Sequence, residues 1–429
     1  MMESSKRPII LRMITVMNKW LIGVFLVFIT VSIMMPGVCF CQEMSNYELM
    51  QELKTLKDKI RILEEKLNKQ EKVSKQEISK EVPTGFEGQG LPERVRRIEE
   101  KMEQKGVLAK WADKITLSGL IEAEACYEDY DYDDPTIKDE DSSDITLATV
   151  ELGVDVDIIK HVKGHVLFLW EEDDTEPVDV DEGFITLDGE DVVPLYLNVG
   201  KLYVPFGNFE SHFISDPLTL ELGETRESAL TVGCVNEWMD VSVSAFNGDI
   251  DETGEDNHIE SFVAGASFSV PEELISNFGI TGGLSYISNI ADSDNLQDAI
   301  DADVGVKDYV GGFNAFLSIS FMDKFFLECE YLGALDEFEP GELSFDGGKE
   351  FQPETWNLEL AYAATDRLEV AVKYEGGDDL GDFLPEDQYG AAVTYGLFEN
   401  TSLALEYLHG KFENDDERDL ITTQLAVEF

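Results

Sequence analysis

One stretch near the middle of the chain gathers residues whose side chains can bind or transform a charged solute. Over residues 205–227, carboxylates alternate with aromatic side chains, and one histidine and one arginine are added. The candidate residues are Glu210, His212, Asp216, Glu221, Glu224 and Arg226. The carboxylates would orient cationic parts of a solute, and Arg226 would pair with a carboxylate or with a solute anion. We therefore predict a surface that filters or binds charged solutes.

A catalytic centre is the alternative interpretation, because His212 beside Glu210 and Asp216 could form part of a hydrolytic or metal site. The five histidines, however, fall in separate segments, and no GxSxG, HExxH or glycine-rich phosphate loop is found. We expect a protein that is not an enzyme and requires no cofactor. In a protein that is not an enzyme, His212 would line a pore or fix the position of its loop.

From about residue 114 onward, apolar residues recur with a period of two. Ile115, Leu117 and Ile121 share one face, whereas Glu122 and Glu124 share the other. One face suits lipid and the other a wet lumen, which is typical of a strand in a transmembrane barrel. The alternation predicts lumen-facing carboxylates at Glu122, Glu124, Glu328, Glu330, Glu359, Glu369 and Glu406.

The fold class predicted from this pattern is an all-β transmembrane barrel of about 16 antiparallel strands. The last segment places Ile421, Leu425 and Phe429 on one face and ends on that aromatic residue, which is typical of outer-membrane barrels. Short and long connections between the predicted strands alternate along the chain. In outer-membrane barrels the short turns face the periplasm and the long loops face outward. A soluble β-sandwich is the alternative, but its fold does not require such an alternation of loop lengths. The predicted strands are 114–127, 144–158, 161–171, 182–188, 194–203, 226–235, 237–247, 258–270, 277–289, 309–321, 324–334, 354–363, 367–376, 387–397, 400–410 and 419–429.

The connection at 204–225 contains Pro205, Gly207 and Pro217, so we expect it to have a defined shape. In a porin such a loop can fold into the lumen and set its narrowest point. Roughly 320 residues are too few for the 22 strands of a plugged transporter, whereas sixteen suffice for an open aqueous channel. We predict a channel constriction here, although the sequence leaves open which way this loop folds.

Charge divides the chain into two regions. The net charge is -57, and residues 1–110 hold 19 Lys and Arg against 15 Asp and Glu, so the acidity belongs to the remainder. Such a field argues against a nucleic acid partner and favours cationic small solutes. The acidic loops are candidates for Ca²⁺, with simple solubilising charge as the alternative, and no EF-hand spacing is present.

The N-terminal region predicts export to the outer membrane of a Gram-negative-type cell. Basic residues precede an apolar run, so residues 1–41 are expected to be a signal peptide, with a retained membrane anchor as the alternative. A heptad seam predicts a coiled coil over 42–72, followed by a linker at 73–92, a short helix at 93–110 and the barrel at 111–429. We expect the helical part to be periplasmic, where it could form a homotrimer or contact the cell wall.

The run Pro205–Ser228, the preceding Val199–Tyr203 and the order of signal peptide, coiled coil and barrel together resemble the LbtU-type siderophore porins. This resemblance implies passage of iron-siderophore complexes across the outer membrane without a plug. The expected function is therefore an outer-membrane porin that passes iron-siderophore complexes through an acidic constricted channel. A general cation-selective porin and an envelope-tethering outer-membrane protein are the alternatives.

Overall fold

The structure is a computed structural model that describes residues 114–429, apart from 173, 174, 176, 190, 191, 255–257, 271–276 and 301–304. The predicted signal peptide, coiled coil, linker and short helix, with the periplasmic, trimer and cell-wall roles given to them, lie outside the described residues. In the described part, no helix is both long and apolar enough to cross a bilayer.

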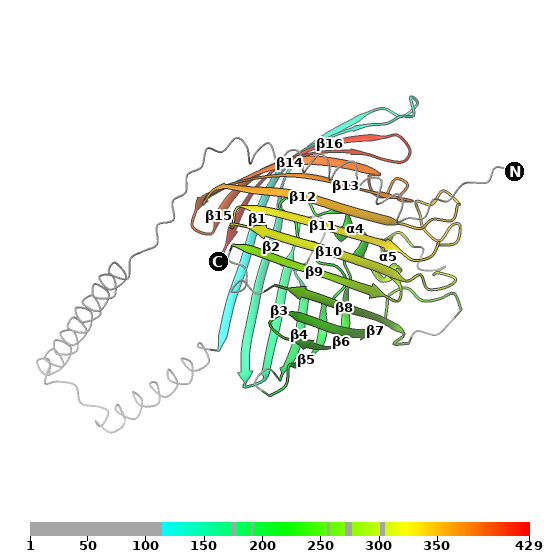
Figure 1. Cartoon of the computed structure of the whole chain (residues 1–429). Helices are drawn as coiled ribbons and strands as arrows, with labels where there is room; N and C mark the ends of the chain where they lie inside the picture. Colours follow the sequence, from blue (N-terminus) through cyan, green and yellow to red (C-terminus); the bar gives the residue numbers. More distant parts are fainter. Residues whose placement is uncertain are drawn as a thin grey trace, which may run out of the picture. The chain divides into compact units, whose positions relative to one another are not determined.

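The described residues form a closed barrel of sixteen antiparallel strands, which confirms the predicted fold class (Figure 1). Each strand pairs with its neighbours in sequence, and β1 pairs with β16 to complete the ring. The strands are β1 (Ile115–Asp131), β2 (Glu140–Ile159), β3 (Val162–Trp170), β4 (Asp179–Asp188), β5 (Leu195–Tyr203), β6 (Arg226–Val235), β7 (Met239–Phe246), β8 (Ser261–Ser269), β9 (Phe278–Ile287), β10 (Gly312–Phe321), β11 (Phe325–Ala334), β12 (Glu354–Thr365), β13 (Leu368–Asp378), β14 (Asp387–Phe398), β15 (Thr401–Lys411) and β16 (Glu417–Glu428).

The terminal phenylalanine takes part in closing the ring. Phe429 and Gly119 exchange backbone hydrogen bonds of 2.9 and 3.0 Å, which continue the β1–β16 ladder to the end of the chain. The Phe429 ring lies directly over Gly119, at a place where a Cβ atom would collide with it. A closed ring leaves no free sheet edge, and this is the condition for placing strands in hydrocarbon.

The polarity of the barrel is reversed relative to a soluble protein. Val393, Leu405 and Val372 are 42%, 51% and 53% exposed on the outer face. In contrast, Glu359 and Glu406 on the inner face are fully buried. An apolar exterior with a polar interior is the distribution that a lipid-embedded channel requires.

Most of the predicted strand limits agree closely with the structure, but the first hairpin differs. The acidic stretch 128–134 was expected to be loop, yet β1 continues to Asp131 and β2 already begins at Glu140. The two strands stay paired as far as Tyr130 opposite Glu140, and β1 also pairs with β16 as far as Asp131 opposite Glu417. Backbone pairing on both sides of β1 therefore outweighs the unfavourable strand preference of its acidic residues.

The longest connections gather at one end of the barrel, where they pack together around an apolar core. The core includes Phe206 and Leu222 from the β5–β6 connection, Ile290 and Leu296 from the β9–β10 connection, and Phe338 after β11. These connections contain the short helices α4 (Leu218–Gly223), η1 (Ile290–Asp292) and α5 (Asp294–Asp298), of which α4 and α5 are labelled in Figure 1. The sequence predicted acidic outward loops here and did not predict that these loops share a hydrophobic core.

The reversed polarity predicts that arginine at two adjacent positions of β14 affects the stability of the barrel to different extents. Val393→Arg places a charge in lipid and should destabilise the barrel by about 2–4 kcal/mol near the bilayer centre. Thr394→Arg is its matched control, because Thr394 pairs with Glu369 on the lumen side. Urea unfolding in liposomes measures both variants, and equal losses of stability would contradict this assignment of faces.

Candidate functional site

The β5–β6 connection, residues 204–225, folds into the barrel and reaches the wall opposite its own strands. Five wall carboxylates that bond it lie on β11, β12, β13 and β15, which occupy the other half of the ring from β5 and β6. The loop also bonds Ser285 on β9 and Asn295 in the β9–β10 connection. Its short helix α4 contacts β11, β12 and β13. The loop therefore crosses the lumen and narrows it, which answers the question that the sequence left open.

Two wall carboxylates hold the first half of the loop. Glu330 accepts hydrogen bonds from the backbone N–H groups of Asn208 (2.8 Å) and Phe209 (3.0 Å). Glu359 accepts from the His212 N–H (2.8 Å) and from the Ser211 hydroxyl (2.8 Å). Hydrogen bonds to a charged acceptor are stronger than neutral ones, each contributing about 1.5–3 kcal/mol.

Three more wall carboxylates hold the rest of the loop. Glu406 accepts from the Ile214 N–H (2.7 Å), the Ser215 N–H (3.1 Å) and the Ser215 hydroxyl (2.5 Å). Glu369 bonds the His212 imidazole at 2.9 Å, and Glu375 accepts from the Leu218 N–H at 3.0 Å. We call Glu330, Glu359, Glu369, Glu375 and Glu406 the latch carboxylates. Glu375 was not among the predicted lumen residues, although it has the same strand parity as Glu369.

The loop bends sharply where the latch begins. Phe209 has a φ of 54°, a left-handed conformation that costs a residue with a Cβ atom about 1–2 kcal/mol. Its ring folds back over Gly207, where a Cβ would collide with it, and Gly207 itself has a φ of 95°. The two successive N–H groups that bond Glu330 stabilise this bend.

A fully buried lysine lies behind the loop. Lys373 on β13 is 3.1 Å from Glu375 and 3.7 Å from Glu359, and its ammonium lies 4.6 Å from the centre of the Phe213 ring. A buried charge requires such partners, and an aromatic face adds a favourable contact. Sequence analysis did not single out Lys373. The sequence did contain a signal for it, because Lys373 has the same strand parity as Glu369 and Glu375 on β13 and is therefore expected to face the lumen.

The remaining predicted lumen carboxylates do not hold the loop. Glu122 and Glu124 lie on β1, and Glu124 accepts a hydrogen bond of 2.9 Å from Gln424. Glu328 lies on β11 opposite Glu359. Within the described residues, no hydrogen bond joins these three side chains to the loop.

The six predicted loop residues separate into two groups. His212 belongs to the latch, Glu221 accepts a hydrogen bond of 2.7 Å from Asn295, and Arg226 forms ion pairs with Asp181 and Asp294. The other three are Glu210, Asp216 and Glu224, and they line a cavity of about 500 Å³. Its walls come wholly from residues 203–225, and its lining includes the aromatic residues Tyr203, Phe209 and Phe213, while the buried Phe206 borders it from the apolar core.

The loop carboxyls share a strongly negative environment. Burial raises the pKa of Asp216; Lys373 opposes this shift, while the charges of Glu171 and Glu124 add to it. Burial also raises the pKa of Glu221 to about 7 and that of Glu224 to about 8, and neighbouring carboxylates contribute to both shifts. The Asp216 residue is nevertheless exposed, so its carboxylate keeps part of its hydration.

The imidazole of the latch responds to two opposing effects. Burial lowers the pKa of His212, but its hydrogen bond to Glu369 and the charges of Glu369, Glu359 and Glu328 outweigh burial and raise the pKa overall. The protonated imidazole would strengthen the contact with Glu369.

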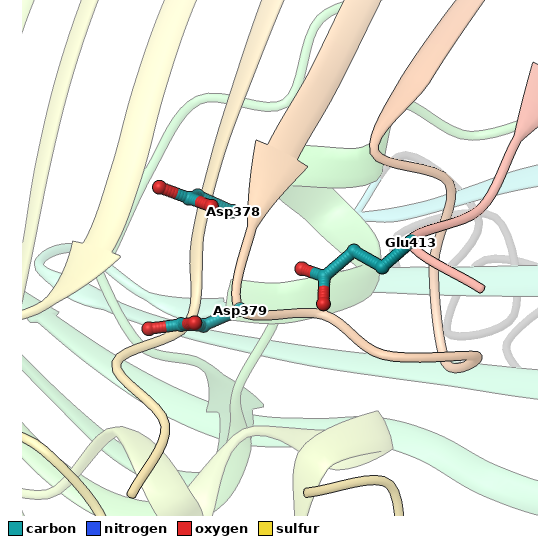
Figure 2. A group of neighbouring side chains, drawn as sticks. All are labelled: Asp378, Asp379 and Glu413. Carbon is teal, nitrogen blue, oxygen red and sulfur yellow. The ribbon is translucent and has the colours of Figure 1, made fainter. Parts of the chain in front are cut away.

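One trio of acidic side chains among the described residues brings carboxylate oxygens within 4.8 Å of one another. It consists of Asp378 and Asp379 at the end of β13 and Glu413 between β15 and β16 (Figure 2). Asp379 accepts a hydrogen bond from the Gln352 N–H and Glu413 accepts one from the Leu380 N–H. Backbone contacts thus account for part of this cluster.

A closed barrel with an apolar exterior, a polar lumen and an inward-folded loop is the fold of a porin-like outer-membrane channel. Solved porin structures share this fold. The outer membrane channel DcaP of Acinetobacter baumannii aligns with a TM-score of 0.50 and 14% identity, covering 73% of this chain and 97% of that one. For an anion-selective porin from Comamonas acidovorans the TM-score is 0.51 at 12% identity, covering 73% and 99%.

Curated relatives carry a name that states no activity. A UPF0422 protein of Coxiella burnetii is 25% identical over 341 residues, covering 76% of this chain and 71% of the relative. A UPF0422 protein of Legionella pneumophila strain Paris is 26% identical over 329 residues, covering 69% of this chain. The alignment spans only 58% of the Legionella protein. No protein-family model matches the chain.

The latch predicts that removing one wall carboxylate loosens the constriction. Glu406→Gln loses a charged acceptor of three hydrogen bonds, so we expect a larger and noisier single-channel conductance in planar bilayers. Glu122→Gln is the matched control, since it removes the same charge from the lumen without touching the loop. If Glu122→Gln raises the conductance equally, lumen charge and not the latch explains the effect.

Proposed function

We propose that the protein is a cation-selective outer-membrane porin whose constriction is formed by the latched β5–β6 loop. The observation that carries this proposal is that both sides of the constriction are acidic. Glu210, Asp216 and Glu224 face it from the loop, and Glu122 and Glu124 face the lumen from β1. The effect of the Glu124 charge on the pKa of Asp216 supports their proximity across the lumen. Carboxylates on both sides lower the energy of a cation and raise that of an anion.

Two cationic residues near the loop are already paired with carboxylates. Lys373 is fully buried behind the loop between two glutamates, and Arg226 pairs with Asp181 and Asp294. A porin fold does not itself set the sign of selectivity, since the Comamonas neighbour with this fold is anion-selective. The sign must therefore come from the side chains of the lumen.

Iron-siderophore complexes are the second candidate solutes. This candidate rests on the resemblance of the Pro205–Ser228 motif to the siderophore porins. The motif covers the inward loop from Pro205 onward and the first three residues of β6. In this proposal the loop, held by the latch carboxylates, selects among complexes by size and charge. Cationic or neutral complexes would then pass more readily than anionic ones.

Reconstitution tests cation selectivity directly. Across a planar bilayer with a tenfold KCl gradient, the reversal potential should have the sign of a potassium-selective pore. Asp216→Asn should move this potential toward zero because it removes a charge from the constriction. A reversal potential near zero or of chloride sign in the unaltered protein would refute the proposal.

Uptake into liposomes tests the siderophore candidate. Vesicles that contain the protein should take up a cationic or neutral ferric siderophore faster than protein-free vesicles, and Glu406→Gln should increase the rate. If uptake of every ferric siderophore matches the protein-free control while potassium flux is intact, the general cation-selective porin is the function.

The raised pKa values of the loop carboxyls predict a dependence of selectivity on pH. Because the pKa of Glu221 is about 7 and that of Glu224 about 8, both groups gain protons as the pH falls from 9 to 6. Fewer negative charges then remain at the constriction, so the permeability ratio of K⁺ to Cl⁻ should decrease several-fold. Reversal potentials measured over this range test it, and the double variant Glu221→Gln, Glu224→Gln should show a flatter dependence.

A further inference from the structure

The open cavity formed by the β5–β6 loop has features of a binding site and not only of a narrow passage. Its walls come from a single segment, residues 203–225, which the latch carboxylates hold in one shape. Its volume of about 500 Å³ is within the range of pockets that accept small organic molecules. A pocket held in this way loses little conformational entropy when it binds a ligand.

Three carboxylates in this cavity accept no hydrogen bond from the described protein groups, although the charges of Lys373 and Arg226 act on Asp216 and Glu224. Within the described residues, the side-chain oxygens of Glu210, Asp216 and Glu224 form no hydrogen bond or ion pair. The latch carboxylates differ, because each accepts hydrogen bonds from the loop. The oxygens of the three free carboxylates remain available to donors from a solute.

Aromatic rings form the other part of the lining. Tyr203, Phe209 and Phe213 line the same cavity as the three carboxylates. Aromatic faces attract cations and also pack against apolar groups. Lys373 already contacts one aromatic ring of this set, that of Phe213, which shows that a cation is accommodated beside the cavity wall.

The arrangement does not suit a bare metal ion. Among the described residues, the oxygens that approach within 4.8 Å as a trio are those of Asp378, Asp379 and Glu413, not those of Glu210, Asp216 and Glu224. A metal ion needs converging oxygen ligands at about 2.0–2.6 Å. Separated carboxylates among aromatic rings instead match a ligand that has a positive end and an apolar body.

We propose that this loop cavity is a binding site for an organic ammonium ion with an apolar or aromatic body. The ammonium group donates to Glu210, Asp216 or Glu224, and the body packs on Phe209 and its neighbouring rings. The proposal rests on the proposed function, because the site lies on the constriction of the cation channel. A bound ammonium ion occupies the passage and reduces the potassium current while it stays.

Block of the potassium current tests the site. The full-length protein in planar bilayers is titrated with phenethylammonium, with phenylacetate as the probe of opposite charge and Mg²⁺ as the inorganic cation. We expect phenethylammonium to block saturably and reversibly, phenylacetate not to block, and Mg²⁺ to act only through weak screening.

Variants identify the residues that hold the ligand. At pH 9, where Glu224 is ionised, Asp216→Asn and Glu224→Gln should each raise the half-blocking concentration about tenfold, the factor expected when one charge-assisted hydrogen bond is lost. Phe209→Leu should weaken block by phenethylammonium more than block by methylammonium, which has no ring. Glu399→Gln, in the turn between β14 and β15, is the matched control and should leave the half-blocking concentration unchanged.

The outcomes separate this site from the proposed function. Potassium selectivity without saturable block, equal block by Mg²⁺, or an equal shift in Glu399→Gln rejects the binding site and leaves the cation-selective porin standing. A reversal potential without potassium preference, together with saturable block that Asp216→Asn weakens, rejects the proposed function and supports the site. A gel-shift assay of heated and unheated samples confirms that each variant has folded before it is measured.

Discussion

The hydrogen bonding between the inward loop and the opposite wall is the interaction on which the channel depends. A loop that crosses a water-filled barrel carries backbone N–H groups that need acceptors, and here four glutamates supply them while a fifth, Glu369, bonds the His212 imidazole. Removing these carboxylates from water costs free energy, and the hydrogen bonds that they accept from the loop offset this cost. Negative charge thus has two roles in this lumen, since some carboxylates fix the loop and others remain open to solutes.

The barrel itself could be predicted from the sequence because its pattern is local. Strict alternation along β1 and β16 needs only neighbouring residues to be recognised, and the lipid selects one face whatever the rest of the chain does. The exception is the acidic end of β1, where pairing with both β2 and β16 extends the strand through Asp131. Such pairing joins distant residues and leaves no trace in the local pattern.

The site could be predicted only in part for the same reason. The loop and its charged residues were identifiable, yet their separation into latch and cavity depends on contacts across the ring. Glu210 and His212 are two residues apart, but one faces the cavity and the other bonds Glu369. Lys373 and the apolar core of the long connections arise from packing between segments far apart in the chain, which sequence patterns do not reveal.

The distance along the chain between the loop and its partners has a consequence for assembly. The hydrogen bond between Ile214 and Glu406 joins residues 192 positions apart, and Glu406 lies on β15, the last strand but one. Contacts of such high sequence separation form late, after most of the chain is in place. The part of the latch that Glu406 supplies can therefore form only once β15 is in place, so the shape of the aperture depends on completion of the ring.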